Sequence, residues 1–437
     1  MSSPAAVLSP LARLAAAQAR LPGGAAWTAW RKAALERLVA LGLPTPRDDA
    51  WKYTNLRLLE RRDLTPAAPR PLGADALDRL PVPTDARLVF VDGRYHAGLS
   101  DPRLAFGIEF TPMATRFATE DPASLGPCLV ADGDAVDERI RLLNACLACD
   151  GACLRVPAGV AAAEPIHLVH VSTGAASYPR SVVELGANAS AALIEYHVTL
   201  ADADGVVVAA TNVALAAGAR LTHTVVQLAG PRSVILDDAA VQLGADAHYA
   251  HRHVALGGQL ARLDLRLGLD GRGASIDLAG LLIADGTRQL DVRTRVDHRA
   301  THTRSEQLYR GVASARGRGS YDGKVVVHSG AQKTDSRQSS RNLLVGREAS
   351  IDARPQLEIN ADDVKCSHGA TTGQLDEQML FYLLSRGLDR ETARALLTYA
   401  FAGDVITRLA PDTLRRSVES RVLGVLPAAA LIREFIA

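Results

Sequence analysis

The sequence has few cysteines and no excess of charge of either sign. Five cysteines in 437 residues, an odd number, argue against a disulfide framework and indicate a reducing compartment. The net charge is +1, from 49 basic and 48 acidic residues, so the chain has no overall field that favours nucleic acid or an anionic membrane. We therefore expect no nucleic acid and no membrane among its partners.

Long apolar runs are also missing. The longest uncharged apolar stretch near the C-terminus, residues 422–432, is too short to span a bilayer and contains Pro427. Arg13 and Arg20 interrupt the apolar segment that a secretory signal requires. The first acidic residue is Glu36, a feature of organellar transit peptides, but the helical pattern continues past it, so we expect a cytoplasmic protein.

The composition is that of a globular protein, with 48% hydrophobic and 22% charged residues. The chain is long for a single core, so we predict one large central domain with smaller flanking ones. Residues 4–43 carry apolar side chains at helical spacing, with a break at residues 22–24, and a further helix is predicted over residues 135–147.

The C-terminal segment is also predicted to be helical. Asp376 and Asp389 each precede an apolar run at helical spacing, as N-caps do, and Gly387 ends the first of these runs. Two short helices are predicted near residues 414–423 and 428–435. Such helical hairpins either cover a core or dock a partner, and their spacing does not decide which.

Between these flanks, residues 154–365 read as short strands with apolar and polar side chains in alternation. Pairs such as Asp270-Gly271, Asp285-Gly286 and Asp322-Gly323 are predicted turns, as is the basic run at residues 314–324. No helical pattern interrupts this region, which excludes a βαβ sheet and leaves a sandwich, a barrel or a solenoid. A strand repeat of about 13 to 15 residues favours the solenoid, with helices capping its ends.

The stretch at residues 355–376 is the strongest candidate for a site. It begins as a strand and carries Cys366 and His368, which leave the same face of a strand with Cα atoms about 6.6 Å apart. Gly369 is predicted to end the strand. The pair is either a small buried thiol beside a hydrogen-bonded imidazole, or two ligands of a metal or cluster. Because such sites usually need four donors, the second interpretation requires another chain or segment.

Three other motifs are interpreted as structural. Cys146, Cys149 and Cys153 have a spacing that iron–sulfur and zinc sites use, but they lie at a helix end and a strand start, so we predict core positions. His248, His251 and His253 lie on one strand without the carboxylates that a metal site needs, so we predict solvated, outward-facing imidazoles. The aromatic and basic cluster at residues 51–53 is interpreted as an anchor that packs a helix on a domain.

Several long motifs resemble one family. Residues 334–401, which include KCSHGATTGQLDEQMLFYL, residues 298–312 (HRATHTRSEQLYRGV) and residues 42–56 (GLPTPRDDAWKYTNL) resemble the SufB/SufD family of the SUF iron–sulfur cluster assembly machinery. Within it they are similar to the SufD branch. Residues 154–365 contain no cysteine, so this core cannot relay sulfur as a persulfide in the way that SufB is thought to do.

The resemblance implies a mainly β fold, a right-handed parallel β-helix between helical terminal domains. The expected domains are an N-terminal helical and mixed domain at residues 1–150, the β-helix core at residues 151–368 and a C-terminal helical domain at residues 369–437. The resemblance also implies a non-catalytic scaffold subunit that pairs with a SufB-like paralogue and binds a SufC-like ABC ATPase.

The same resemblance assigns the site residues. Cys366 and His368 would meet the SufB-like partner, where iron or a transient iron–sulfur cluster is held, with His368 ligating or receiving iron and Cys366 a sulfur donor. The helices that would dock the ATPase contain Gly373, Leu380, Phe381, Tyr382, Arg386, Gly387, Ala400 and Phe401. No cofactor is expected to bind the isolated chain tightly, whereas the sequence leaves open whether a flavin binds the full complex.

Two alternatives remain at this stage. The first is a β-helix enzyme that acts on polysaccharide, which predicts a groove of charged side chains along the core, with Asp291 and Arg293 as examples. The second is a homodimer of the isolated chain, formed through its edge strands.

Overall fold

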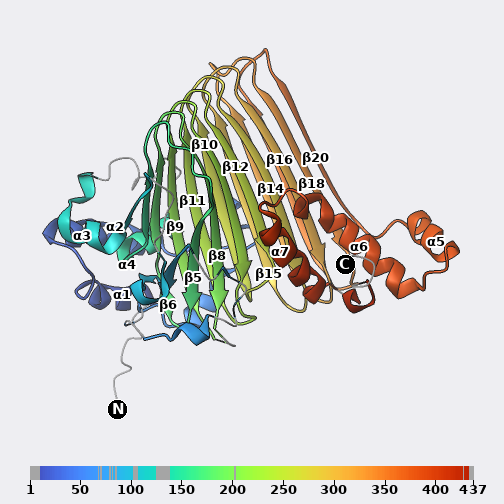
Figure 1. Ribbon diagram of the computed structural model, residues 1–437, viewed down its shortest axis with the longest axis horizontal. Coiled ribbons are helices and arrows are strands. Elements are labelled where there is room, and N and C mark those ends of the chain that lie inside the picture. Colours follow the sequence, from blue (N-terminus) through green and yellow to red (C-terminus); the bar gives the residue numbers. More distant parts are fainter. Residues whose placement is uncertain are drawn as a thin grey trace.

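The structure is a computed structural model. It describes residues 10–66, 68, 71–77, 80, 82–83, 86–101, 107–124, 138–200, 203–426 and 428–432. Its centre is a parallel β-solenoid (Figure 1). The long strands are stacked side by side along the long axis of the molecule, and each strand runs across that axis. The N-terminal helices pack near one end of the stack and the C-terminal helices near the other.

Two sheets form the walls of the solenoid, and the chain alternates between them, because consecutive long strands belong to opposite sheets. One wall, here called sheet A, contains β3 (Glu109–Pro112), β4 (Ala152–Val156), β6 (Ala176–Ser177), β7 (Arg180–Leu185), β9 (Val206–Leu215), β11 (Val234–Leu243), β13 (Leu260–Leu269), β15 (Gln289–His298), β17 (Arg318–Val327) and β19 (Ser350–Ile359). The other, sheet B, contains β1 (Arg87–Val91), β2 (Arg94–Tyr95), β5 (Ile166–Ser172), β8 (Ser190–Thr199), β10 (Arg220–Leu228), β12 (His248–Ala255), β14 (Ser275–Ala284), β16 (Arg304–Ala313), β18 (Asp335–Leu344) and β20 (Lys365–Gly373).

The alternation in the sequence explains this architecture. On β13, Leu263, Leu265 and Leu267 face the interior, and register pairing stacks them on the inward-facing residues of β11 and β15. The strands begin at Leu260, Ser275 and Gln289, in agreement with the predicted repeat. The prediction of a parallel β-helix core flanked by helices is therefore confirmed.

Two local predictions are wrong. Asp322 and Gly323 lie inside β17 rather than in a turn, because β17 pairs with β15 and β19 at these positions. The strand needs glycine at position 323, since a Cβ there would sit 2.0 Å from the Gln338 side-chain nitrogen. Only the start of the basic run at residues 314–324 lies in a turn, because β17 begins at Arg318. Gly369 does not end the last strand, which continues to Gly373 through pairing with β18.

The two ends of the solenoid differ. At the N-terminal end the short strands β2 and β3 pair antiparallel with their neighbours and close the sheets. At the C-terminal end β19 and β20 are the last strands of their sheets. β20 is exposed along almost its whole length, so this end presents unpaired strand edges.

Most of the N-terminal region covers the outer face of sheet A, while Leu77 and Leu99 pack on the outer face of sheet B. Its helices are α1 (Pro10–Gln18), α2 (Ala25–Leu41), α3 (Met113–Thr119) and α4 (Arg139–Leu147), and its short 3-10 helices are η1 (Asp49–Trp51), η2 (Leu56–Arg61), η3 (Ala74–Ala76) and η4 (Ala97–Leu99). Leu38, Leu59 and Leu143 share a buried cluster with outward-facing residues of β9, β11 and β13. The predicted break at residues 22–24 separates α1 from α2, while residues 4–9 and 135–137 lie outside the described part.

The C-terminal region consists of α5 (Glu377–Ser385), α6 (Arg390–Ile406), α7 (Asp412–Val425) and η6 (Ala429–Ile432), of which α6 and α7 cover the outer face of sheet B. Asp376 and Asp389 cap α5 and α6 by accepting hydrogen bonds from two backbone N–H groups each, as predicted, and Gly387 adopts φ +90° between these helices. Residues 433–435 of the last predicted helix lie outside the described part. None of the helices that the structure describes is long and apolar enough to cross a bilayer.

Candidate functional site

Cys366 and His368 lie on the inward-facing side of β20, the final strand of the solenoid. Their neighbours on β18 are Ser336 and Gln338, which register pairing places directly opposite them. Ser336 and Gln338 are buried, whereas Cys366 is half-buried and His368 is exposed. The difference arises because β20 covers β18 on this side and no later strand covers β20. The thiol and the imidazole are therefore part of a surface.

The surroundings of Cys366 favour the protonated thiol in the isolated chain. Partial burial and the negative charge of Asp335 raise the pKa of Cys366, and the backbone N–H of Ser336 acts in the opposite direction. A cation or a positive partner group at this surface would shift the balance toward the thiolate.

The described residues do not complete a metal site around this pair. Among them, no three histidine, cysteine, aspartate or glutamate side chains are grouped so as to hold a metal ion. A metal ion held by Cys366 and His368 would therefore need further donors from outside the described residues.

The predicted docking residues lie on β20 and on the hairpin of α5 and α6. α5 projects away from the solenoid beyond α6 (Figure 1). Its side chains Met379, Phe381 and Tyr382 are 58%, 72% and 59% exposed, whereas Leu380 is buried. Gly373, Arg386, Gly387 and Ala400 are exposed, and Phe401 is half-buried.

An exposed apolar surface of this kind is unusual for a helix that has no further role. Arg386 lies 5.8 Å from the centre of the Tyr382 ring and Arg310 lies 5.8 Å from that of Phe401, so each aromatic group has a cation beside it. Phe381 has the largest exposed fraction among the large hydrophobic residues that the structure describes.

The cysteine cluster is structural, as predicted. Cys146, Cys149 and Cys153 are buried, and desolvation raises the pKa of Cys146 to about 12 and that of Cys153 to about 11. Thiols in such surroundings remain protonated and unreactive. The anchor at residues 51–53 is also confirmed, since Trp51 is buried with the Arg262 guanidinium 3.8 Å from its ring centre.

The prediction for the histidine motif is wrong. His251 and His253 face the interior of the solenoid and are buried, and a carboxylate lies close by. Glu195 on β8 lies close to three imidazoles, those of His170 at 3.0 Å, His197 at 3.1 Å and His223 at 3.2 Å, and the last of these contacts is a hydrogen bond. His248 alone faces outward, where it bonds Ser275. Pairing between β5, β8, β10 and β12 brings these side chains together, and the spacing of residues within one strand does not predict that pairing.

This interior cluster couples the charges of its members. The three imidazoles around Glu195 hold its pKa well below its usual value against the effect of burial. Burial lowers the pKa of His197, but the Glu195 carboxylate beside it outweighs this effect and raises it. Burial instead lowers the pKa of His253 to about 3. The sequence signal for this cluster is the pair Glu195 and His197, which has the same two-residue period as His251 and His253.

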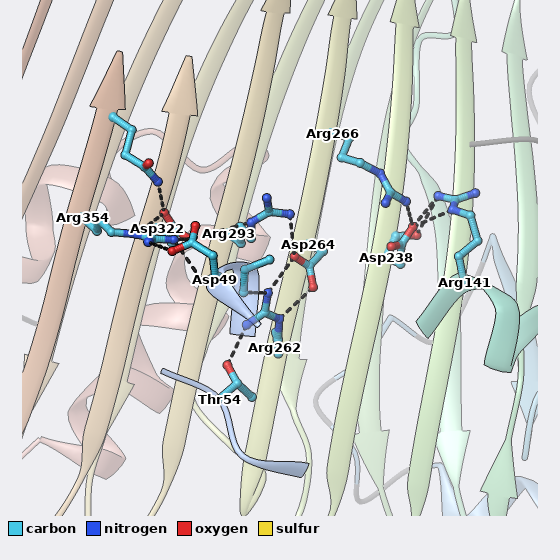
Figure 2. Close-up of polar contacts among 12 residues, drawn as sticks. Asp49, Thr54, Arg141, Asp238, Arg262, Asp264, Arg266, Arg293, Asp322 and Arg354 are labelled. Atoms are coloured by element: carbon cyan, nitrogen blue, oxygen red, sulfur yellow. Dashed lines mark hydrogen bonds and ion pairs between the residues drawn. The ribbon is translucent and has the colours of Figure 1, made fainter. Parts of the chain in front are cut away.

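The charged residues that a polysaccharide enzyme would use are part of a ladder on the outer face of sheet A (Figure 2). Arg293 lies between Asp264, at 3.8 Å, and Asp322, at 3.7 Å. Asp291 is buried and accepts hydrogen bonds from Thr54 and Ser320. These groups pair with one another, and Asp291 also fastens the N-terminal segment to the sheet through Thr54.

The fold and the site together define a β-solenoid with an unfinished pair of donors at its open end. Comparison with known proteins identifies the family. Residues 168–401 match the family model described as SUF system FeS cluster assembly, SufBD core domain, so the chain belongs to the SufB/SufD family.

Its relatives include proteins named for the same system. The chain is 33% identical over 404 residues to the iron–sulfur cluster assembly protein SufD of Escherichia coli, covering 91% of this chain and 92% of that protein. It is 26% identical to SufD of Bacillus subtilis, over 89% of this chain and 92% of that protein. A SufBD family protein of Synechocystis is 29% identical over 87% and 86% of the two chains. The chain is thus a SufD-like iron–sulfur cluster assembly protein.

Proposed function

We propose that the chain is a non-catalytic scaffold subunit that completes its donor site by pairing with a SufB-like paralogue. The observation that carries this proposal is the position of Cys366 and His368 on the inward face of an uncovered terminal strand. A strand from a second solenoid, added beside β20 or β19, would satisfy the unpaired backbone groups and place its own side chains next to this pair.

Iron, or the cluster being built, is the cargo of this site. The imidazole of His368 binds iron through a nitrogen lone pair, and the Cys366 thiolate is a soft donor to iron or sulfur. The thiol gives up its proton on binding, so the raised pKa of Cys366 keeps the site weak until a partner or cation arrives.

The hairpin of α5 and α6 is the proposed docking surface for a SufC-like ABC ATPase. The exposed Met379, Phe381 and Tyr382 supply the apolar centre and Arg386 a charged rim, the composition typical of interface hot spots. Movement of this hairpin during ATP hydrolysis would be transmitted through α6, whose Asp404 pairs with Arg310 on β16 at 2.8 Å. The expected effect is a shift between the two paired solenoids that exposes the donor site.

The test is reconstitution of the chain with both partners, supplied with ferrous iron and a sulfide source. We expect His368→Ala to form the same complex but to assemble clusters, followed by anaerobic absorption spectroscopy, at a strongly reduced yield. His302→Ala, at another exposed histidine, is the matched control. Wild-type yield from His368→Ala would contradict the assigned role.

The isolated chain is proposed to form a homodimer through the same edges, because they are exposed when the partner is missing. The polysaccharide alternative receives no support from the ladder on sheet A, where the charged groups pair with one another. Turnover of a polysaccharide by the chain alone would reverse this judgement.

A further inference from the structure

A pocket of about 570 Å³ lies where α7 packs over the outer face of sheet B. Figure 1 shows α7 in front of the strands of this sheet. The residues that line the pocket are Leu228, Ala229, Leu256, Arg288, Ser417, Ser420, Arg421, Gly424 and Val425. None of them belongs to the donor pair or to the hairpin of α5 and α6. The volume is within the range of sites that hold small organic molecules, so the pocket is a candidate ligand site that the proposed function does not use.

One face of α7 supplies the polar side of this pocket. Ser417, Ser420, Arg421 and Gly424 follow one another at helical spacing, which places them on one side of the helix. The buried apolar residues of α7 lie on the adjacent stripe and pack in one cluster with the outer face of sheet B. Because that packing fixes the orientation of α7, the polar stripe is held in place beside the ends of β10 and β12.

Arg421 is a cation without a partner. Its side chain is half-buried, and the guanidinium group forms no ion pair or hydrogen bond with the residues that the structure describes. Burial lowers the pKa of Arg421. A guanidinium group that loses water without gaining an acceptor raises the free energy of the folded state. An anion bound in the pocket would supply the missing acceptor.

A second guanidinium group lines the pocket from the turn between β14 and β15. Arg288 forms an ion pair with Asp285, and its Nε is buried without a hydrogen-bond partner among the described residues. No aspartate or glutamate is among the described residues that line the pocket. With the hydroxyl groups of Ser417 and Ser420, the pocket therefore has an excess of positive charge and of hydrogen-bond donors.

The donors and the walls together indicate the class of ligand. A guanidinium group presents parallel N–H donors that match two oxygens of a phosphate group, and serine hydroxyl groups can donate to further oxygens. The remaining walls are the apolar side chains of Leu228, Leu256 and Val425. They suit the organic part of the same molecule, whereas inorganic phosphate alone would leave most of the volume unfilled.

We propose that this pocket binds a small phosphate monoester, with its phosphate group on Arg421 and Arg288 and its apolar group against Leu228 and Leu256. The hydroxyl groups of α7 donate to the remaining phosphate oxygens. Binding needs neither a partner chain nor iron, so it is a property of the isolated chain and independent of the proposed function.

Equilibrium dialysis of the isolated chain with 1-naphthyl phosphate, detected by its fluorescence, tests this proposal. We expect a dissociation constant of about 0.5 mM, the affinity of an unoptimised ligand of this size. In competition experiments, inorganic phosphate should bind about tenfold more weakly because it lacks the apolar ring. 1-Naphthoic acid should bind about fivefold more weakly, because a carboxylate has fewer oxygens and less negative charge than a phosphate group.

Two variants separate the charge of the pocket from its shape. We expect Arg421→Gln to weaken binding about tenfold or more, through the loss of a charge-assisted hydrogen bond. Arg416→Gln is the matched control, an exposed arginine of α7 that does not line the pocket. A Cβ at Gly424 would meet no atom within 4 Å, so Gly424→Leu can be accommodated and fills the pocket. It should abolish binding and leave the circular dichroism spectrum unchanged.

No binding of 1-naphthyl phosphate to the wild type, or equal binding to Arg421→Gln and Arg416→Gln, would overturn the proposal. Equal affinity for inorganic phosphate would overturn the assignment of an organic ligand, and tighter binding of 1-naphthoic acid would overturn the assignment of a phosphate group. The yield of clusters from His368→Ala is a separate measurement, so failure of this proposal and failure of the proposed function are distinguishable.

Discussion

Asp49 and Arg354 lie 305 positions apart in the sequence and form an ion pair of 2.6 Å. Asp49 belongs to the N-terminal η1, and Arg354 lies on β19, the last strand of sheet A (Figure 2). Arg354 also donates to Asp322 at 2.6 Å. The first segment of the chain is thereby tied to the open end of the solenoid, beside the strands that we propose to bind a partner.

We expect Arg354→Met to lower the free energy of unfolding by about 2 kcal/mol, because it leaves the buried Asp322 without its bidentate partner. Urea denaturation followed by circular dichroism measures this change. Arg304→Met is the matched control, since Arg304 is exposed and its pairing with Asp335 is long, at 3.9 Å. Equal effects of the two substitutions would contradict a structural role for the ladder at this end.

Glu195 is predicted to hold the polar interior together. Glu195→Gln removes the charge that three imidazoles share, and we expect a loss of about 3 kcal/mol or more in the free energy of unfolding. Glu306→Gln, on the exposed face of β16, is the control. Thermal and urea unfolding of both variants would show the difference, and a fully stable Glu195→Gln would mean that the imidazoles find other partners.

The buried neutral histidines predict a loss of stability in acid. His298 has a folded-state pKa of about 4 against 6.5 for the free side chain, so the unfolded chain binds a proton that the folded chain does not. The contribution of neutral His298 to the free energy of unfolding is fully present above pH 6.5 and is lost as the pH falls toward 4. It amounts to about 3 kcal/mol.

Urea denaturation at a series of pH values measures this dependence. We expect His298→Gln to flatten the slope of stability against pH between 6.5 and 4, and His302→Gln, at an exposed position, to leave it unchanged. The same slope in His298→Gln as in the wild type would show that His298 is not the titrating group.

The strand edge at β20 predicts self-association of the isolated chain. Ala370 is exposed and lies on the same face of β20 as Cys366 and His368. We expect Ala370→Lys, an inward-pointing charge on an edge strand, to convert the dimer to a monomer in light scattering, and to weaken binding to a SufB-like partner. Thr371→Lys, which points to the other face, should have little effect. A persistent dimer in Ala370→Lys would place the interface elsewhere.

The apolar surface of α5 predicts the ATPase contact. We expect Phe381→Glu to weaken binding of a SufC-like ATPase at least tenfold in calorimetry without changing the fold, because Phe381 is 72% exposed. Val39→Glu, at an exposed apolar residue of α2, is the control. Undiminished binding by Phe381→Glu would remove this surface from the proposed function.

The predictions from sequence were most accurate where the signal is local. The caps at Asp376 and Asp389 depend on side chains that bond backbone groups two or three residues away, so their identity alone marks the helix starts. The predictions failed where a neighbouring strand decides the outcome. Gly323 and Gly369 continue their strands because β15, β18 and β19 pair with them, although glycine commonly marks a turn.

The amino-acid pattern favoured a solenoid over a sandwich or a barrel and pointed to its candidate donors, because alternation at a two-residue period and a regular repeat are properties of the chain as written. It also placed Cys366 and His368 on one face of a strand. Which side of the wall a residue faces, and which residues lie behind it, depends on how the strands stack. Stacking of parallel strands places Glu195 beside the imidazoles of β5 and β10, and places Ser336 and Gln338 beside Cys366 and His368. These residues are about 30 positions apart in the sequence, so the spacing within one strand does not predict their contacts.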